Sequence, residues 1–227
     1  MPDVVILVPR RAGNPYRDGV WAWLEPWWAE QFPDWRLVVG DVGDDGPFLR
    51  SAALNAAAAA AGDWDVALCI DADVLTDTAS IRAAVAAALG TGYHVLGYNE
   101  RRHLHKQGTA QILDGYRGNW TPFTRTHLTD SCSSMNAVRR DLWDKVGGFD
   151  EEFRGWGWED IAFRIATEAA SAAPLVKITG TCWHLWHPKS PENDNNQATF
   201  LANQARGTAY KQARWNWPAI QQLRSTT

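Results

Sequence analysis

The sequence lacks several features that mark whole classes of proteins. It has only 3 cysteines in 227 residues, and Cys69, Cys132 and Cys182 are widely spaced and form no C-x-x-C pair. This argues against a disulfide framework and a zinc site, and it suits reduced thiols in the cytoplasm. No apolar run approaches the roughly 18 residues of a membrane span. Val4–Val8 is too short for a signal peptide and lacks a basic leader. We therefore expect a cytoplasmic protein without a membrane span.

An excess of basic charge is also absent. With 22 Lys and Arg against 26 Asp and Glu, the net charge is −4. We therefore expect no broad basic surface for long polyanions, although a local basic pocket for a diphosphate is compatible with this charge. Tryptophan, in contrast, is abundant, with 14 residues. Indole rings fill cores and also stack on the faces of sugar rings, so both interpretations stay open at this point.

The first half of the chain alternates between short apolar runs and segments of helix length. Repeated β–α units at this spacing are typical of an open parallel sheet with right-handed crossovers. We therefore expect one α/β domain with a mostly parallel central sheet flanked by helices. The predicted strands are Val4–Val8, Leu37–Val39, Val66–Ile70 and Tyr93–Gly97, and the predicted helices are Gly19–Phe32, Pro47–Ala61 and Thr78–Leu89.

The second half is less regular. Residues 99–129 lack clear periodicity and carry a basic cluster from Arg101 to Lys106. We interpret this stretch as a long loop, which is either functional or simply solvated. Beyond it the sequence predicts strands at Ser134–Val138 and Leu175–Thr179, and helices at Arg140–Val146, Asp160–Ala170 and Asn196–Arg214.

Polar residues follow several of the predicted strands. Ligands of open α/β sheets bind beyond the carboxyl ends of the strands, so Pro9–Arg11, Asp41 and Asp71–Asp73 should share one rim. The carboxylates of Asp71 and Asp73 can reach one divalent cation, and oxygen ligands suit Mg²⁺ or Mn²⁺. The D-x-D spacing alone is weak evidence, because Asp63-Trp-Asp65 shares it. That second pair precedes a strand, and we predict a turn there.

The segment from Gly147 to Asp160 reads Gly-Gly-Phe-Asp-Glu-Glu-Phe-Arg-Gly-Trp-Gly-Trp-Glu-Asp. Its glycines allow sharp turns that bring Trp156 and Trp158 close to a ligand. Glu159 and Asp160 then open a helix. Acidic residues are favoured there because they complement the helix dipole. A carboxylate presented by such a loop can also accept the proton of an attacking hydroxyl, which is the work of a general base.

Two histidines and one arginine complete the candidate residues. His184 and His187 lie in Cys-Trp-His-Leu-Trp-His after a predicted strand, where either could join the aspartates around a metal or serve a structural role. Arg50 lies on the helix after the second strand. Its guanidinium can bind the oxygens of a diphosphate in a bidentate way, although an isolated arginine is usually a surface residue.

Taken in order, these segments resemble the metal-dependent glycosyltransferases of the GT-A fold, within the broader family 2 glycosyltransferases. They most resemble the β-1,4-galactosyltransferase and chondroitin-polymerase type. The similarity runs from residue 8 to residue 187, and its most specific part is the segment from Gly147 to Asp160. The matching pieces are Val8-Pro-Arg-Arg11, Phe48-x-Arg50 with Leu54-Asn55, Asp71-x-Asp73, Gly147-Gly-Phe-Asp with Gly155-Trp-Gly-Trp-Glu-Asp160, and His184 with His187.

The resemblance implies transfer of a hexosyl or N-acetylhexosaminyl group from a UDP-sugar, with Mn²⁺ or Mg²⁺ as cofactor. Asp73 and one histidine would bind the metal, with Asp71 supporting metal and ribose. His187 is favoured over His184, because Cys-x-His-x-x-His also resembles the polypeptide GalNAc-transferases. The implied donor contacts are Pro9, Arg10, Arg11, Asp41 and Arg50; Asp160 is the implied base, Glu159 a sugar or acceptor contact, and Trp156 or Trp158 the platform for the sugar.

The resemblance also implies how the work is divided along the chain. Residues 1–98 would form the half that binds the nucleotide-sugar, residues 99–190 the acceptor and catalytic half, and residues 191–227 a helical tail. The segments Arg101–Gly118 and Pro188–Asn196 are candidates for a lid that orders when the donor binds. One well-placed base implies a single displacement with inversion at the anomeric carbon.

The sequence departs from the family at two positions. Trp158 stands where the family has a second glycine, and Ile161 stands where it has another acid. Both leave the donor sugar and the acceptor open: a carbohydrate, a protein glycan, a small molecule or, through the Arg101–Lys106 cluster, a modified nucleic-acid base. Two other functions stay as alternatives, a nucleotidyltransferase and a non-catalytic carbohydrate-binding protein. The first would release pyrophosphate, and the second would need neither the aspartate pair nor a base.

Overall fold

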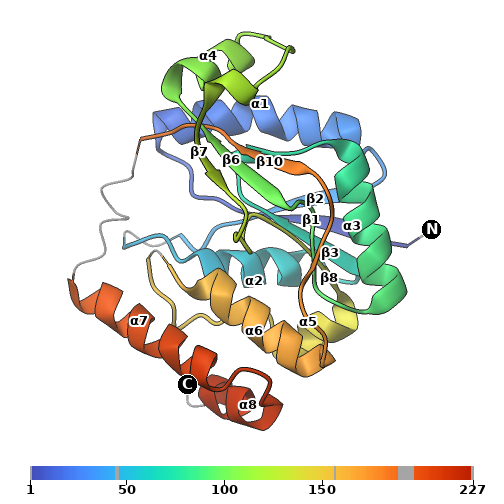
Figure 1. Ribbon diagram of the computed structural model, residues 1–227, viewed down its shortest axis with the longest axis vertical. Coiled ribbons are helices and arrows are strands. Elements are labelled where there is room, and N and C mark those ends of the chain that lie inside the picture. The colour runs from blue at the N-terminus through green and yellow to red at the C-terminus, as the bar shows by residue number, and fades with distance from the viewer. Residues whose placement is uncertain (1, 44–45, 156, 189–196, 226–227) are drawn as a thin grey trace.

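The computed structural model of the chain describes residues 2–43, 46–155, 157–188 and 197–225. Two sheets and their helices form a layered α/β structure (Figure 1). The strands are β1 Val4–Pro9, β2 Arg36–Gly40, β3 Val66–Ile70, β4 Val74–Leu75, β5 Val95–Leu96, β6 Glu100–Leu104, β7 Thr124–Leu128, β8 Met135–Arg139, β9 Val176–Lys177 and β10 Thr181–His184. The helices are α1 Pro15–Gln31, α2 Arg50–Ala60, α3 Thr78–Thr91, α4 Lys106–Leu113, α5 Arg140–Val146, α6 Glu159–Ser171, α7 Gln197–Gln212 and α8 Trp217–Ser225, with a 3₁₀ turn η1 at Thr121–Phe123.

The main sheet has six strands in the order β2-β1-β3-β8-β5-β9. β1 pairs in parallel with β2 and β3, and β5 pairs in parallel with β9. β8 runs antiparallel to both of its neighbours, β3 and β5. The prediction of a mostly parallel central sheet is therefore confirmed.

Two hydrophobic clusters cover the two faces of this sheet. Successive side chains of a strand point to opposite faces, so the fully apolar β1 contributes to both clusters. Ile6 packs with α1 and α3 on one face, where Leu24 and Trp28 are completely buried. Leu7 packs with α2, α5 and α6 on the other face. The C-terminal helices α7 and α8 extend this second cluster, and they form the lower edge of the molecule in Figure 1.

A second sheet, in the order β4-β10-β6-β7, corrects the interpretation of residues 99–129. That stretch contains β6, α4 and β7, so the prediction of a long loop was wrong. β6 reads Glu-Arg-Arg-His-Leu and shows no apolar alternation, yet β10 and β7 pair with it on its two sides. Backbone hydrogen bonds, which the hydrophobic pattern does not reveal, order this strand. The first residues of the candidate lid Arg101–Gly118 lie on β6, which is an interior strand of this sheet.

Two further expectations concern the whole chain. None of the described helices is both long and apolar enough to cross a membrane. Cys69, Cys132 and Cys182 are all buried free thiols, as expected for reduced cysteines.

Candidate active site

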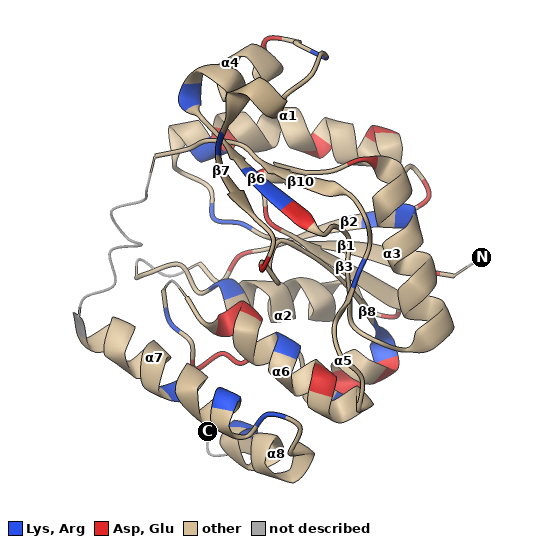
Figure 2. Cartoon of the chain, in the orientation of Figure 1, with Lys and Arg blue, Asp and Glu red and all other residues tan. Residues whose placement is uncertain are grey.

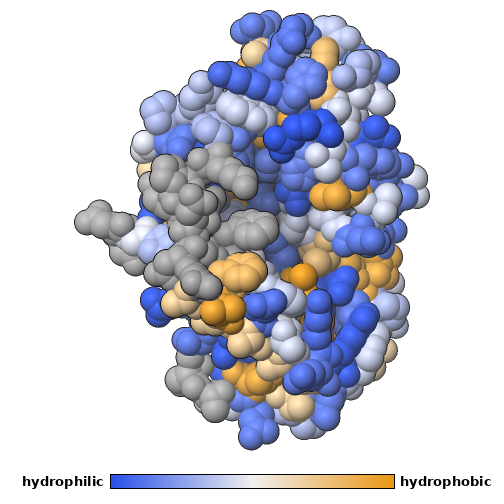
Figure 3. Space-filling view, turned by 60° about the vertical axis from the view of Figure 1, so that its left-hand side comes forward, coloured by the Kyte–Doolittle hydropathy of each residue, from blue (hydrophilic) through white to orange (hydrophobic). Residues whose placement is uncertain are grey.

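The carboxyl ends of β1, β2 and β3 meet on one side of the main sheet, as the sequence predicted. This side faces left in Figure 1, and it comes forward in Figure 3, where the surface is hollowed. Asp71 follows β3 directly, and two groups bind its side chain. Arg50 donates from Nε to Oδ1 at 2.9 Å, and the hydroxyl of Ser134 donates to Oδ2 at 2.7 Å. Burial opposes ionisation, but the Arg50 guanidinium holds the pKa of Asp71 below its usual value.

Arg50 also joins Asp71 to Asp160. Its Nη1 donates to Asp160 Oδ1 at 2.8 Å, and Glu159 Oε1 lies 3.9 Å from the same nitrogen. Arg50 is the first residue of α2, while Glu159 and Asp160 are the first residues of α6. Figure 2 shows this meeting as a basic segment at the start of α2 beside an acidic segment at the start of α6. Two segments 110 positions apart in the sequence thus share one partly buried ion-pair network.

The protonation of the acidic pair is finely balanced. Burial raises the pKa of Asp160 to about 7, with Arg50 opposing the rise and Glu159 adding to it. Burial also raises the pKa of Glu159. A carboxyl group with a pKa near neutrality can both accept and release a proton at physiological pH. Asp160 therefore has the acid–base property that a general base needs.

Asp73, His184 and His187 form a second cluster beside the first. Each offers one ligand atom, and the three atoms lie within 4.8 Å of one another. His187 Nε2 is 3.0 Å from Asp73 Oδ2, and His184 Nε2 is 3.6 Å from Asp73 Oδ1. Arg17 of α1 approaches the same carboxylate at 3.5 Å. Burial opposes ionisation of Asp73, but His184, His187 and Arg17 together hold its pKa well below the usual range.

The chemistry of this cluster fits a divalent cation. The Nδ1 of His187 is 2.8 Å from the carbonyl oxygen of Pro188, so Nδ1 carries a proton. In the neutral ring the lone pair of Nε2 then faces Asp73 Oδ2, which is favourable only with a proton or a cation between them. Within the described part of the chain, Asp73 Oδ1 is buried without a hydrogen bond. Burial lowers the pKa of His184 to about 4 and keeps its imidazole neutral, which is the form that binds metals.

The two histidines differ in their surroundings. A carbonyl partner on the second ring nitrogen orients a metal-binding histidine, and His187 has such a partner in Pro188. His184 instead stacks on His103, with ring centroids 4.5 Å apart and planes inclined by 24°. His187 is therefore the better oriented of the two candidate ligands, in line with the preference drawn from the sequence.

The predicted donor residues at the ends of β1 and β2 divide into two groups. Arg11 lies 3.8 Å from Asp41, donates to the Gly46 carbonyl at 2.7 Å and covers the Phe48 ring, so these residues form one corner of the rim. Arg10 instead pairs with Asp18 of α1, next to Pro9 at the end of β1. Both arginines are thus engaged by neighbours in the structure, Arg10 at α1 and Arg11 at the end of β2.

The Gly147–Asp160 segment is anchored on α2 by hydrogen bonds. Asn55 accepts a hydrogen bond from the Phe149 amide at 2.8 Å and donates to the Phe149 carbonyl at 2.9 Å. A Cβ atom on Gly148 would lie 2.4 Å from Asn55 Oδ1, which explains the glycine. The ring of Trp158 packs on α7 rather than standing free. Trp156 lies outside the described residues.

Three residues of the site escaped the sequence analysis. Ser134 donates a hydrogen bond to Asp71, and Arg17 forms an ion pair with Asp73. Arg101 donates to the hydroxyl of Ser133, which is 3.4 Å from that of Ser134. The basic cluster that contains Arg101 was a signal in the sequence, but it was interpreted as an acceptor loop. No motif marked Ser134 or Arg17, since their partners lie 63 and 56 positions away and depend on the register of strands and helices.

Comparison with known proteins agrees with this geometry. Residues 122–172, which include the Gly147–Asp160 segment, match the family model described as the N-terminal domain of galactosyltransferase. Among solved structures, the catalytic domain of Drosophila β1,4-galactosyltransferase 7 with xylobiose is similar, with a TM-score of 0.61 and 15% identity over 90% of this chain and 80% of that one. A mutant of the same enzyme, in complex with manganese, UDP-Gal and xylobiose, gives a TM-score of 0.60 and 16% identity over 88% and 79% of the two chains.

A bacterial structure is similar as well. Glucosyl-3-phosphoglycerate synthase from Mycobacterium tuberculosis, in complex with Mn²⁺, UDP and glucosyl-3-phosphoglycerate, gives a TM-score of 0.51 and 15% identity over 94% of this chain and 80% of that one. This chain has the GT-A fold. No curated protein sequence matches the chain significantly. The predicted resemblance and fold class are confirmed, and the galactosyltransferase match together with the fold supports a glycosyltransferase as the class of enzyme.

Proposed function

We propose that this GT-A chain transfers a sugar from a UDP-sugar to an acceptor hydroxyl, with inversion at the anomeric carbon. The observation that carries the proposal is the double role of Arg50, which binds Asp71 beside the candidate metal cluster and Asp160 at the start of α6. This arginine places a donor-side carboxylate and a candidate base in one hydrogen-bonded unit. Both neighbouring enzymes described above were crystallised with manganese and UDP or UDP-Gal.

The cation of the proposal is Mn²⁺ or Mg²⁺. Asp73 and His187 would hold it, with His184 as the alternative or additional ligand and Asp71 as a supporting carboxylate. When bound, the cation neutralises negative charge on the leaving diphosphate. Arg17 and Arg50 add positive charge at the same rim, and both are already engaged with its aspartates.

The donor would lie across the ends of the first strands, which assigns residues 1–98 to donor binding. Asp41 and Arg11 would contact the nucleoside, with Pro9 and Arg10 shaping the rim behind them. The acceptor hydroxyl attacks the anomeric carbon as the bond to the diphosphate breaks. Asp160 accepts the hydroxyl proton in the same step, because a carboxylate at this position is ionised in about half of the molecules at a pH near its pKa of about 7. Glu159 would contact the sugar or the acceptor.

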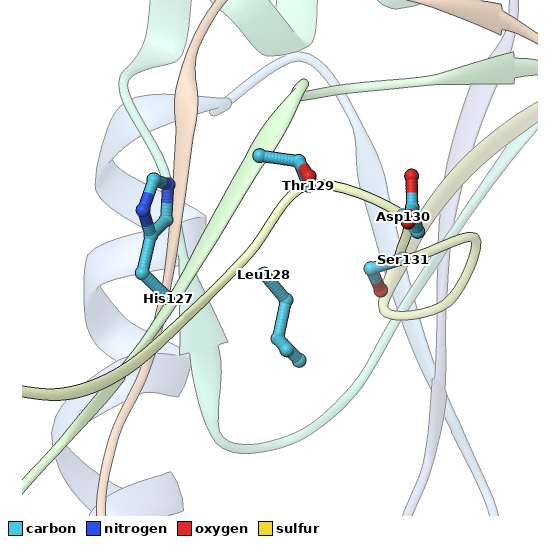
Figure 4. Close-up of a pocket in the computed structure, with 5 residues that line it drawn as sticks. All are labelled: His127, Leu128, Thr129, Asp130 and Ser131. Carbon is cyan, nitrogen blue, oxygen red and sulfur yellow. The ribbon is translucent and has the colours of Figure 1, made fainter.

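The acceptor would enter from residues 99–190. A cavity of about 390 Å³ lies along the end of β7, lined by residues 127–131, and Figure 4 shows the side chains of His127 and Leu128 diverging on either side of the strand. Ser131 connects this cavity to the site through its contact with Ser133, 3.2 Å away. Burial raises the pKa of the next residue, Cys132, to about 11, and the charge of Asp160 adds to the rise.

A direct assay tests the proposal. The purified chain is incubated with UDP-glucose, UDP-galactose or their N-acetylhexosamine counterparts, with Mn²⁺ or EDTA, and with an added free sugar or water as the acceptor. The released nucleotide is identified by chromatography. We expect UDP release with at least one donor, dependent on the cation and reduced about 100-fold or more in Asp160→Asn, the loss expected when a positioned base is removed. Arg140→Gln, at an exposed ion pair outside the site, is the matched control.

Three results would contradict the proposal. Release of pyrophosphate in a parallel reaction that supplies UTP and a sugar 1-phosphate would identify a nucleotidyltransferase, and sugar binding without turnover would identify a carbohydrate-binding protein. Full activity of Asp160→Asn would remove the assigned base. The matches favour neither alternative, and the cytoplasmic location stays a prediction.

A further inference from the structure

Trp158 occupies an unusual backbone position at the start of α6. Its φ of 78° and ψ of −22° lie in the left-handed region, which favours glycine and is rare for a bulky residue. Its carbonyl accepts the first hydrogen bond of α6, from Ala162 at 2.9 Å. The direction in which α6 presents its next two residues, Glu159 and Asp160, therefore depends on the conformation of Trp158.

The indole ring of Trp158 is anchored on a different helix. A Cβ atom added to Gly207 of α7 would lie 2.2 Å from Trp158 Cε3 and 2.5 Å from Cδ2, so the ring rests directly on the backbone of α7. Lys211, one helical turn further along, places its ammonium 4.5 Å from the ring centroid. Glycine is normally unfavourable inside a helix. Here it makes room for the ring that replaces the glycine of the galactosyltransferase pattern.

The helices α7 and α8 also hold the rest of the same segment. Asn203 donates to the Arg154 carbonyl at 2.8 Å and accepts from the Arg154 amide at 3.3 Å. Both Arg206 and Tyr210 bond Asp150 Oδ2, each at 2.7 Å. Contacts from α7 are thus spread over the segment that leads to Asp160.

The last helix reaches the beginning of this segment. Arg224 donates to the carbonyl oxygens of Gly147 and Gly148, at 3.2 and 2.9 Å. Neither contact involves a residue of the metal cluster. They fix the backbone that connects α5 to α6, and the candidate base Asp160 lies in the first turn of α6.

We propose that the C-terminal helices position the base, and that Trp158 and Gly207 are the central pair of positioning residues. The proposal rests on the proposed function only in giving Asp160 the role of the base. In this proposal neither residue of the pair acts on the reacting atoms, because the ring of Trp158 packs on α7 and supports the turn instead of serving as the platform for the sugar. Their contact fixes the left-handed turn at Trp158, and that turn fixes the alignment of Asp160 with Arg50. This assigns to α7 a part in the reaction that the galactosyltransferase motifs, which end at residue 187, do not contain.

A double-mutant cycle tests the pair. Gly207→Ala places a methyl group where the ring of Trp158 now lies. Trp158→Gly removes the ring and leaves a residue that suits the left-handed backbone. We expect Gly207→Ala to lower the Tm by several degrees and to lower kcat about ten- to 100-fold, with the donor KM within about twofold, because a misplaced catalytic group affects the chemical step most. In the Trp158→Gly background, Gly207→Ala meets no ring. The double variant should therefore have a higher Tm than Trp158→Gly alone and the same kcat as Trp158→Gly alone.

Gly90→Ala is the matched control. Gly90 is also inside a helix, α3, and a Cβ atom there meets nothing within 4 Å. This variant should be at least as stable as the wild type and fully active. Should Gly207→Ala not fold, Trp158→Gly alone carries the test, since loss of the anchor should lower kcat and leave the donor KM unchanged.

Two outcomes would overturn the proposal. One is an unchanged kcat in Gly207→Ala despite a lowered Tm, which would make the pair purely structural. The other is an equal effect of Gly207→Ala with and without the Trp158 ring. A wild-type chain without transferase activity would instead contradict the proposed function, and the Tm cycle would still report the contact between the two residues.

Discussion

Asp160 combines burial with a single strong cationic partner, and this combination has a consequence for the pH profile. Burial raises its pKa to about 7, and a base must be ionised to accept a proton. We therefore expect kcat to fall as the pH decreases through about 7, by roughly tenfold for each further unit. The measurement is kcat between pH 5.5 and 9 at saturating donor and Mn²⁺.

Asp160→Glu is the informative variant for this profile, because it keeps the carboxyl group and changes its position. It should retain a pH-dependent residual activity, whereas Asp160→Asn should lose the dependence with the activity. A wild-type kcat that stays constant from pH 5.5 to 8 would contradict the assignment of Asp160 as the base.

The two histidines of the metal cluster should contribute unequally. His187 is oriented by the Pro188 carbonyl, while His184 stacks on His103. We expect His187→Ala to weaken Mn²⁺ binding by about 100-fold or more, because losing a residue that only orients a ligand already costs about 10- to 100-fold, and His184→Ala to weaken it about tenfold. Isothermal titration with MnCl₂ in the presence of UDP measures both. Equal losses would mean that both rings are direct ligands, and a larger loss in His184→Ala would reverse the assignment.

For individual residues, the sequence predicted most of the side chains that meet at the site, but not all of the contacts between them. Asp71, Asp73 and Asp160 were predicted from their places after a strand and before a helix, and the order of the motifs supplied the rest. Ser134 and Arg17 carry no such signal. Their positions follow from the antiparallel pairing of β3 with β8 and from the packing of α1 on the sheet, which are long-range results of folding.

Among the elements, β5, β8 and α6 are tied together by one buried histidine. His94, just before β5, has its Nε2 2.8 Å from Asn136 of β8 and its Nδ1 2.8 Å from Thr167 of α6. Burial lowers its pKa to about 4 from an ordinary value of 6.5. In the unfolded chain His94 is therefore protonated below about pH 6.5, whereas in the folded chain it is protonated only below about pH 4. Stability that is present above pH 6.5 should be lost as the pH falls through this window.

The size of this loss can be measured by urea unfolding at pH 7 and pH 5. Two-state proton linkage gives about 2 kcal/mol for this one group at pH 5. Carboxyl groups titrate in the same range, so the comparison is made against His94→Gln, which cannot charge. The fall in unfolding free energy between the two pH values should be smaller in the variant by about that amount. An identical fall in both proteins would show that His94 does not control acid stability.

The elements that the sequence predicted well are those with strong apolar periodicity. The strands β1 and β3 and the helices α3 and α5 were placed within about two residues at each end, as is usual for boundaries. β6 and β10 were missed because their residues are mostly polar or aromatic and show no apolar pattern. The two strands are ordered by the backbone hydrogen bonds between them. β4 has only two residues, too few to show any period.

On the scale of the whole molecule, the two hydrophobic clusters explain why the site lies where it does. Each face of the main sheet is covered by helices, and the strand ends between them are left for charged groups. The division of the chain into donor residues 1–98, acceptor residues 99–190 and a tail stays a prediction. The contacts of α7 and α8 with residues 147–158 nevertheless show that the described part of this tail is joined to the site.

The contact between Trp158 and Gly207 also yields a criterion for other sequences. A tryptophan immediately before the Glu-Asp pair should occur only together with a small residue at the facing position of a C-terminal helix, and chains with the usual glycine should be free to carry a larger side chain there. The two positions should therefore vary together across any set of homologues. A chain with tryptophan at the first position and a bulky aliphatic residue at the second would need another way to hold the turn, and finding many such chains would contradict the criterion.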